Sequence, residues 1–234
     1  MMSKGKLILI PVPIAEDGLS TLSPMVKNQV QTIRHYVVEN IRTARRFLKS
    51  IEPSVVIDEL QFIEIDKHNG VEIATFEKWL EAGHAIGLMS EAGCPGVADP
   101  GAEVVSVAQK LNAEVIPLVG PNSMILALMA SGMNGQSFCF VGYLPVKEPT
   151  RSLKIKALEA VSKKENQTQL FIETPYRNQQ LLDELLKSLQ GSTKLCIAQN
   201  ITAANQFIKT KRVEQWQQQK PLLEKLPTVF LMLG

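Results

Sequence analysis

The fold of this chain is decided by the stretch Met89-Ser90-Glu91-Ala92-Gly93-Cys94-Pro95-Gly96-Val97-Ala98-Asp99-Pro100-Gly101. The apolar residues 85–88 before it predict a short buried strand, and residues 102–111 after it predict a helix. The stretch is therefore a strand-to-helix loop with three glycines, two prolines and two carboxylates. Ligands of open α/β sheets bind in such loops, beyond the carboxyl ends of the strands.

The same loop also fits a plain turn. In that interpretation Asp99 caps the following helix and Pro100 is its first residue. The loop matches neither the Rossmann glycine fingerprint nor the phosphate-binding P-loop. Composition alone leaves the ligand-binding and the structural interpretation equally open.

The alternation of strand, Gly/Pro loop and helix recurs through the first half of the chain. The apolar runs predict strands at 7–10, 35–38, 85–88 and 115–119, with an irregular strand region at 55–65 and a turn at Asn69-Gly70. Helical spacing predicts helices at 24–33, 42–51, 71–82, 102–111 and 124–131. This order is typical of an α/β fold with a doubly wound, mainly parallel sheet.

The pattern changes after Gly132, where strands become denser. Strands are expected at 138–141, 169–172, 194–198, 206–210 and 227–233, and helices at 151–164, 178–189 and 212–219. This half therefore predicts a second α/β domain with a mixed sheet. We expect an N-terminal domain at 1–119 and a C-terminal domain at 120–234.

Composition narrows the class of protein further. The chain has 234 residues, of which 45% are hydrophobic and 21% charged, with a formal net charge of +2. Cys94, Cys139 and Cys196 are scattered and show neither metal spacing nor a disulfide framework, so we expect no metal site. The apolar run 7–12 is too short for a signal peptide, and no segment approaches the roughly 20 apolar residues of a membrane span. We therefore expect a cytoplasmic protein without a membrane anchor.

One segment is strongly basic despite the near-neutral whole. Residues 27–49 contain six basic residues and one acid, Glu39. This pattern fits either a solvated helix face or a surface that binds phosphates. The residues expected to contact an anionic substrate there are Arg42, Arg45 and Arg46.

Several motifs together resemble the tetrapyrrole-methylase superfamily. The motifs are Ile10-Pro11-Val12-Pro13-Ile14, Ser90-Glu91-Ala92-Gly93-Cys94-Pro95 with Asp99-Pro100-Gly101, Val119-Gly120-Pro121-Asn122-Ser123, Ala130-Ser131-Gly132, Val141-Gly142-Tyr143-Leu144-Pro145 and Glu173-Thr174-Pro175-Tyr176-Arg177. Each motif alone is weak, but six in the family's order over nearly the whole chain are specific. The pattern is most similar to the branch that methylates a cytidine ribose 2′-hydroxyl in small-subunit ribosomal RNA.

This resemblance implies an S-adenosylmethionine-dependent methyltransferase with two α/β domains. It implies that the cofactor binds in the cleft between them and that the protein is a homodimer. Carried over by motif, the expected cofactor contacts are Pro13, Ser90, Glu91, Ala92, Gly93, Cys94, Pro95, Ser123, Met124, Phe171 and Thr228.

The chain departs from that branch at several motif positions. Ala15 stands where the branch has glycine, and Asn40 where it has an acid. Glu91 is one methylene longer than the usual aspartate, and Tyr176 replaces a histidine. A charged motif of the second domain is uncharged around Gln206. These departures bear on RNA specificity more than on methyl transfer.

Methyl transfer to a hydroxyl depends on alignment, and a proton acceptor assists it. The candidate catalytic residues are Glu39, Asp99 and Glu173, and Arg177 joins the expected substrate contacts. Each acid also has a structural interpretation. Glu39 fits an ion pair with Arg42, Asp99 fits a helix cap, and Glu173 fits a role in orienting Arg177.

Two other functions remain open from the sequence. One is a methyltransferase of a small molecule such as a tetrapyrrole precursor, although the Gly-Ala-Gly-Asp-Pro loop expected there is absent. The other is a non-catalytic module that binds S-adenosylmethionine. An NAD enzyme is disfavoured, because no Gly-x-Gly-x-x-Gly follows a predicted strand.

Overall fold

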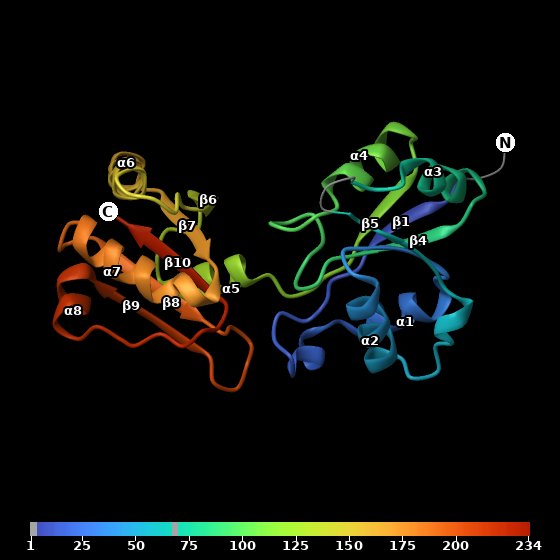
Figure 1. Cartoon of the computed structure of the whole chain (residues 1–234), viewed down its shortest axis with the longest axis horizontal. Coiled ribbons are helices and arrows are strands. Elements are labelled where there is room, and N and C mark those ends of the chain that lie inside the picture. Colours follow the sequence, from blue (N-terminus) through green and yellow to red (C-terminus); the bar gives the residue numbers. More distant parts are fainter. Residues whose placement is uncertain (1–3, 67–69) are drawn as a thin grey trace. The chain divides into compact units, whose positions relative to one another are not determined.

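The structure is a computed structural model that describes residues 4–66 and 70–234. The chain forms two compact units that divide between Asn122 and Ser123 (Figure 1). We call them the first unit and the second unit. The division lies three residues beyond the domain boundary expected from the sequence.

A five-stranded sheet forms the centre of the first unit. Its strands are β1 (Lys6–Leu9), β2 (His35–Val38), β3 (Gln61–Glu64), β4 (Ala85–Met89) and β5 (Glu114–Pro117), in the order β3-β2-β4-β1-β5. All neighbouring strands are parallel, as predicted. Because parallel strands share a direction, their carboxyl ends lie along one edge of the sheet.

Helices cover both faces of this sheet. On one face lie α1 (Pro24–Thr32) and α2 (Ile41–Ile51), and on the other lie α3 (Ile73–Glu81) and α4 (Ala102–Lys110) (Figure 1). Alternate strand residues feed the two cores: Ile8 packs with α1 and α2, whereas Leu7 packs with α3 and α4. Full burial of each such side chain contributes roughly 2 kcal/mol.

Two expectations for the first unit need correction. The predicted strand 115–119 ends at Pro117, and Val119 is 80% exposed in the loop that follows. The irregular region 55–65 separates into a 3-10 helix (Ile57–Glu59) and β3. Of the predicted turn, Gly70 has a left-handed backbone with φ of 76°, and Asn69 lies outside the described residues.

The second unit contains the mixed sheet that the sequence predicted. Its strands are β6 (Phe138–Tyr143), β7 (Thr168–Glu173), β8 (Lys194–Gln199), β9 (Phe207–Arg212) and β10 (Thr228–Leu233), in the order β6-β7-β10-β8-β9. The β6–β7 pair is parallel, and the other pairs are antiparallel. The carboxyl ends of β6 and β7 therefore meet at one edge.

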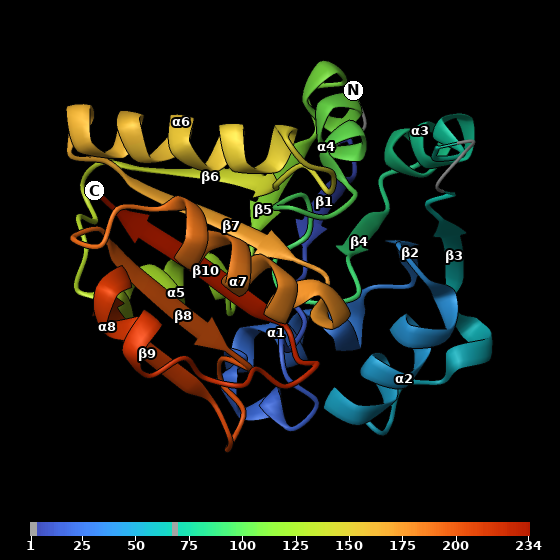
Figure 2. The same ribbon diagram turned by 60° about the vertical axis from the view of Figure 1, so that its left-hand side comes forward.

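The helices of the second unit cover its sheet unequally. One face carries α6 (Thr150–Glu165), α7 (Asn178–Ser188) and α8 (Val213–Gln218), whose apolar residues share one core with the strands (Figure 2). The buried Trp216 indole donates to the carbonyl of Leu195 at 2.9 Å and fixes α8 to that core. Only α5 (Ser123–Ser131) packs on the other face, against β9 and β10.

No helix of residues 4–66 and 70–234 is both long enough and apolar enough to cross a membrane.

Candidate active site

Three loops leave the carboxyl ends of β1, β4 and β5, and backbone contacts tie them together. Val12 donates its N–H to the carbonyl of Gly93 at 2.9 Å and accepts the N–H of Gly93 at 3.1 Å. Gly120 lies so close to Pro11 that an added Cβ would stand 2.1 Å from the Pro11 Cβ. The loops that the sequence marked by Gly and Pro therefore form one connected group.

The loop after β4 has an unusual backbone. Gly93 has a φ of 69° and Gly101 a φ of 129°, which side chains rarely adopt. Ala98, with a φ of 63°, adopts the left-handed region despite its Cβ, which costs on the order of 1 kcal/mol. This strained residue immediately precedes Asp99 and sets the direction in which the chain presents that carboxylate.

Glu39 and Glu91 link the end of β2 to the loop after β4. Glu39 Oε2 accepts the backbone N–H of Glu91 at 3.0 Å, and Glu91 Oε1 accepts the Thr43 hydroxyl at 2.9 Å. Among the described residues Glu39 forms no ion pair with Arg42, so that interpretation was wrong. The structure thus brings the predicted residues Glu39 and Glu91 together, through a hydrogen bond from the backbone of one to the side chain of the other.

Sequence reasoning missed Thr43 and the structural role of Asn40. The Asn40 side chain caps α2 by accepting the N–H of Thr43 at 3.0 Å, and the Thr43 hydroxyl lies between Asn40 Oδ1 at 3.1 Å and Glu91 Oε1 at 2.9 Å. Asparagine before a helix is a recognised capping signal. This signal could have identified Asn40 as a structural residue rather than as a lost acid.

Asp99 is an acid of the first unit whose pKa is strongly raised. It is partly buried, and burial raises its pKa to about 6, with the negative charges of Glu39 and Glu91 acting in the same direction. The helix after this loop has Gly101 at its N-cap and no side-chain cap, so Asp99 is not its capping residue. The structure therefore brings Glu39, Glu91 and Asp99 into one group of carboxylates.

The other predicted residues of this loop hold its shape. Ser90 is buried, and its hydroxyl donates to the carbonyl of Ala92 at 3.0 Å. The Cys94 thiol donates to the carbonyl of Pro121 at 3.4 Å, and burial raises its pKa. Pro95 is buried as well, whereas Ala92 is exposed.

Pro13, in the loop after β1, packs beside Gly18, where an added Cβ would lie 3.2 Å from the Pro13 Cβ. In residues 4–66 and 70–234 no three His, Cys, Asp or Glu side chains are grouped so that they could hold a metal ion.

The three predicted arginines line one pocket beside these carboxylates. This arginine pocket, of about 550 Å³, lies between the start of α2 and the end of β3 and is formed by Asn40, Ile41, Arg42, Arg45, Arg46 and Glu64. Arg45 places its guanidinium 5.3 Å from the centre of the Phe62 ring. Asn40 belongs both to this pocket and to the cap that directs Thr43 toward Glu91.

The remaining predicted cofactor contacts lie in the second unit. Ser123 and Met124 begin α5 and are partly exposed. Phe171 is fully buried in the core and stacks on Phe230 with ring centres 6.0 Å apart, so its side chain is not open to a cofactor. The Thr228 hydroxyl is buried and bonds to Leu226, Asn178 and Gln199. Both side chains are engaged within the second unit, and Phe171 and Thr228 stay predictions as cofactor contacts.

Glu173 ends β7 and holds Arg177. Its Oε1 accepts the Nη2 of Arg177 at 2.8 Å and the N–H of Thr174 at 2.7 Å, and its Oε2 lies 3.7 Å from the Nη2 of the buried Arg151. Burial alone would raise the pKa of Glu173, but the hydrogen bonds from Arg177 and Thr174 hold it below its ordinary value. A carboxylate so engaged is a poor proton acceptor. These contacts favour the orienting role over the catalytic one.

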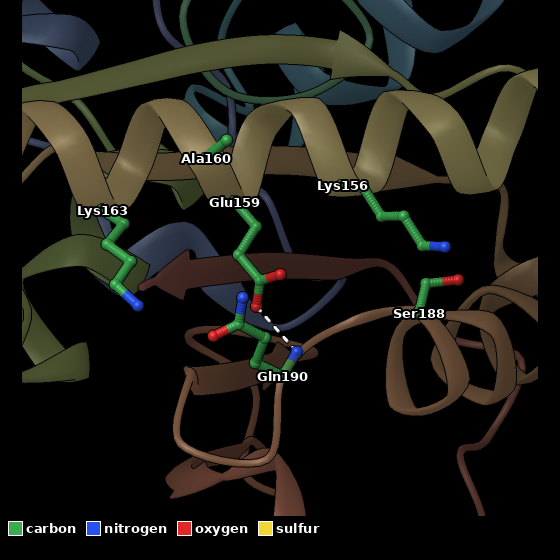
Figure 3. A pocket seen from close by; sticks show the side chains of 6 residues that line it. All are labelled: Lys156, Glu159, Ala160, Lys163, Ser188 and Gln190. Atoms are coloured by element: carbon green, nitrogen blue, oxygen red, sulfur yellow. Dashed lines mark hydrogen bonds between the residues drawn. The ribbon is translucent and has the colours of Figure 1, made fainter.

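A second pocket, of about 280 Å³, lies on the second unit beside α6. Its lining is Lys156, Glu159, Ala160, Lys163, Ser188 and Gln190 (Figure 3). The Glu159 carboxylate points toward the turn after α7 and accepts the N–H of Gln190 at 2.8 Å, as well as the Thr193 hydroxyl. Its only acid is therefore used to join α6 to that turn, and no predicted site residue lies there.

A family model described as "Tetrapyrrole (Corrin/Porphyrin) Methylases" matches residues 27–217. The chain belongs to the tetrapyrrole methylase family. It is an S-adenosylmethionine-dependent methyltransferase of that family.

Curated relatives of this family member share a common name. A "Ribosomal RNA small subunit methyltransferase I" of Buchnera aphidicola subsp. Schizaphis graminum is 30% identical over 205 residues, which cover 87% of this chain and 68% of the relative. The protein of the same name from Bacillus subtilis is 29% identical over 200 residues, covering 85% and 64%. The chain spans about two thirds of the length of these relatives.

Solved structures of methyltransferases share the fold of this family member. The methyltransferase CobJ superposes with a TM-score of 0.61 at 17% identity, over 99% of this chain and 95% of that one. A uroporphyrin-III C-methyltransferase from Thermus thermophilus, complexed with S-adenosylhomocysteine, gives a TM-score of 0.56 at 13% identity over 98% of both chains. These likenesses confirm the predicted fold of two α/β domains.

Proposed function

We propose that this chain methylates small-subunit ribosomal RNA, at a ribose 2′-hydroxyl. The observation that carries the proposal is the arginine pocket, because its Asn40 and the neighbouring Thr43 connect it directly to Glu91 of the carboxylate loop. Arginine is well suited to phosphate, which it binds through two parallel hydrogen bonds. A polyanion held in this pocket would lie beside the acids of the same sheet edge. The names of the relatives support the same substrate.

The groups of this edge fit S-adenosylmethionine. The cofactor has a sulfonium, an ammonium group and ribose hydroxyls, all of which carboxylates and backbone carbonyls recognise. On this proposal Glu91 and the backbone from Ser90 to Pro95 hold it, together with the Pro13 loop. Ser123 and Met124 remain predicted contacts. When bound, the cofactor supplies an activated methyl group.

Within this proposal Asp99 accepts the proton of the ribose hydroxyl. A hydroxyl is a weak nucleophile, and a base whose pKa lies near the working pH assists it best. With a pKa of about 6, Asp99 is mostly ionised at neutral pH yet binds a proton more readily than an ordinary aspartate. Glu39 and Glu91 act on this reaction by keeping the pKa of Asp99 high.

We propose that the protein forms a homodimer through the face of the second sheet on which α5 packs. That face of the second sheet carries one helix, on which Met129 is 74% and Ile125 is 43% exposed. Exposed apolar side chains of this size mark interaction surfaces when they gather. Light scattering should give twice the mass of one chain, and Met129→Lys should shift it toward a single chain.

The test of the proposed function is to identify the methylated product. The protein is incubated with labelled S-adenosylmethionine and small ribosomal subunits from cells that lack the modification. Mass spectrometry of the digested RNA should find one nucleotide heavier by a methyl group on its ribose. Label only in small molecules or in protein would contradict the proposal.

The arginine pocket has its own test. Arg42→Ala with Arg45→Ala should weaken RNA binding and lower the salt dependence by about one phosphate contact per arginine. Cofactor affinity, measured by calorimetry, should stay unchanged. Arg34→Ala is the matched control, because Arg34 is an exposed arginine of the same basic segment outside the pocket. Lost cofactor binding in a folded double variant would contradict this role.

A further inference from the structure

Two large aromatic side chains are exposed at the edge of the second sheet where the parallel strands β6 and β7 end. Tyr143 ends β6 and is 61% exposed, and Tyr176 follows β7 and is 67% exposed. Tyr143 pairs with Ile172 in the β6–β7 register, four residues before Tyr176 in the chain. Both rings therefore belong to the same end of the same parallel strand pair.

Arg177 completes this group. Its guanidinium lies 5.2 Å from the centre of the Tyr176 ring, and its Nη1 donates to the Tyr176 hydroxyl at 3.5 Å. The pKa of Arg177 is raised chiefly by its hydrogen bond to Glu173, with smaller contributions from Tyr176 and Tyr143. Both tyrosines thus lie near one guanidinium. We call Tyr143, Tyr176 and Arg177 the stacking cluster.

The stacking cluster stands on a buried charged base. Arg151 is only 2% exposed, and its Nε donates to the carbonyl of Pro145 at 2.7 Å. Its Nη2 is buried without a hydrogen-bond acceptor and reaches only the Glu173 carboxylate, at 3.7 Å. A buried unsatisfied guanidinium N–H is unfavourable for folding. Its contact is with the carboxylate that clamps Arg177, so Arg151 and Glu173 are positioning residues for Arg177.

The charges of this group do not balance. Two guanidinium groups share the single carboxylate of Glu173, which leaves one positive charge without a partner within the group. Arg177 is the guanidinium that reaches the surface, with 28% of its side chain exposed. The group is therefore set to receive an anion at Arg177, directly beside an exposed aromatic ring.

We infer that the stacking cluster binds an unpaired segment of RNA, with a base on the tyrosine rings and a phosphate on Arg177. This inference rests on the proposed function, since it names the form of RNA that the enzyme takes. Proteins recognise unpaired bases by stacking them on aromatic and arginine side chains. Bases within a duplex are stacked on one another and present only their edges. The cluster therefore selects a single strand over a duplex.

The test uses a short single-stranded oligoribonucleotide that carries 2-aminopurine, whose fluorescence falls on stacking. Full-length wild-type protein should quench it, whereas Tyr176→Ala should bind it about ten-fold more weakly and lose the quenching. Tyr143→Ala should act in the same direction. Tyr176→Phe keeps the ring and should retain both binding and quenching. A blunt duplex of the same sequence should bind wild type and Tyr176→Ala equally.

Controls separate this effect from a change of fold. Phe138→Ala removes an exposed aromatic from the opposite end of β6 and should leave quenching unchanged. Because Tyr176 is exposed, its alanine variant should keep the near-ultraviolet circular dichroism of the buried core. Arg177→Lys keeps the charge but loses the planar group, so it should weaken single-strand binding with little effect on duplex binding.

The outcomes distinguish this inference from the proposed function. If wild type methylates small subunits but Tyr176→Ala binds the single strand as wild type does, the stacking cluster is overturned and the proposed function stands. Equal losses for single strand and duplex would also overturn it. If wild type quenches the probe through Tyr176 but methylates no ribosomal RNA, the proposed function fails and the stacking cluster stands.

Discussion

The carboxyl edges of the two sheets are built in opposite ways. In the first unit, backbone contacts between Val12 and Gly93, and the packing of Gly120 on Pro11, hold the loops together. In the second unit, ion pairs between side chains hold the edge together, because Glu173 lies between Arg151 and Arg177. The first edge presents carboxylates, and the second presents tyrosines and a guanidinium.

The two edges shift the pKa of an acid in opposite directions. Asp99 is partly buried and has acids for neighbours, so its pKa rises to about 6, whereas hydrogen bonds from Arg177 and Thr174 lower the pKa of Glu173. A carboxylate that must take up a proton cannot also hold the loops together through ion pairs, because an ion pair keeps it ionised. At the first edge the loops are joined by backbone contacts and by Glu39 and Glu91, which leaves Asp99 for the proton.

The largest expected effect comes from removing the proton acceptor. Asp99→Asn keeps the shape of the side chain but cannot take a proton, so kcat should fall by about 10²- to 10⁴-fold. Cofactor affinity by calorimetry should change little. Single-turnover rates with saturating RNA give the measurement, and a variant within ten-fold of wild type would reassign Asp99 to structure.

The second effect comes from breaking the ion pairs of Glu173 in the second unit. Glu173→Gln leaves the buried Arg151 without its counter-ion, and breaking a buried pair should lower the free energy of unfolding by about 3 kcal/mol. Denaturant unfolding followed by Trp216 fluorescence, in a Trp79→Phe background, reports this unit. Glu165→Gln, which removes an exposed acid, is the control and should change little. A small loss in Glu173→Gln would show that the edge does not depend on its ions.

The third effect is on the backbone packing of the first edge. Gly120→Ala places a Cβ against the rigid ring of Pro11 and should destabilise the first unit by about 1–3 kcal/mol, with weaker cofactor binding. Equilibrium unfolding and calorimetry measure the two losses. Gly135→Ala has open space around its new Cβ and serves as the matched control. Unchanged cofactor affinity would mean that the three loops need not be joined.

The smallest effect is a shift in pH dependence. For wild type, kcat/KM should rise with pH through a midpoint of about 6, as Asp99 loses its proton. Glu39→Gln removes a neighbouring negative charge, so the midpoint should move to lower pH and the rate at pH 6 should increase at most about two-fold. Glu114→Gln, at the start of β5, should leave the profile unchanged. A midpoint that moves to higher pH would contradict this coupling.

The fold was largely predictable from the sequence, because its elements follow local rules. Apolar runs marked the central strands, and the helix predicted at 24–33 does begin at Pro24, where the Ser23 hydroxyl accepts the N–H of Met25. Helix α4 and the loop before it were also found. Errors arose where the end of a strand depends on burial in the folded chain. Val119 is apolar, yet it lies exposed beyond the end of β5.

The site was less predictable, because its chemistry depends on residues far apart in the chain. The pKa of Asp99 is raised by burial and then by Glu39, which lies sixty residues earlier, and no local pattern contains either cause. The sequence predicted Arg151 only as the first residue of the helix 151–164, yet it is buried against Glu173. Phe171 was assigned to the cofactor by motif, although a strand pattern cannot tell a core residue from a lining one.

The carboxylate group of the first edge also ties stability to acidity. Asp99 binds its proton more tightly in the folded chain than in the unfolded chain, where its pKa is near 3.8. Its contribution to stability is therefore full below that pKa and is lost as the pH rises through about 6, by on the order of 1 kcal/mol after solvent screening. Methyl transfer and thermodynamic stability thus place opposite demands on this one position. Chains of this family that had lost the reaction would be expected to gain stability by neutralising it.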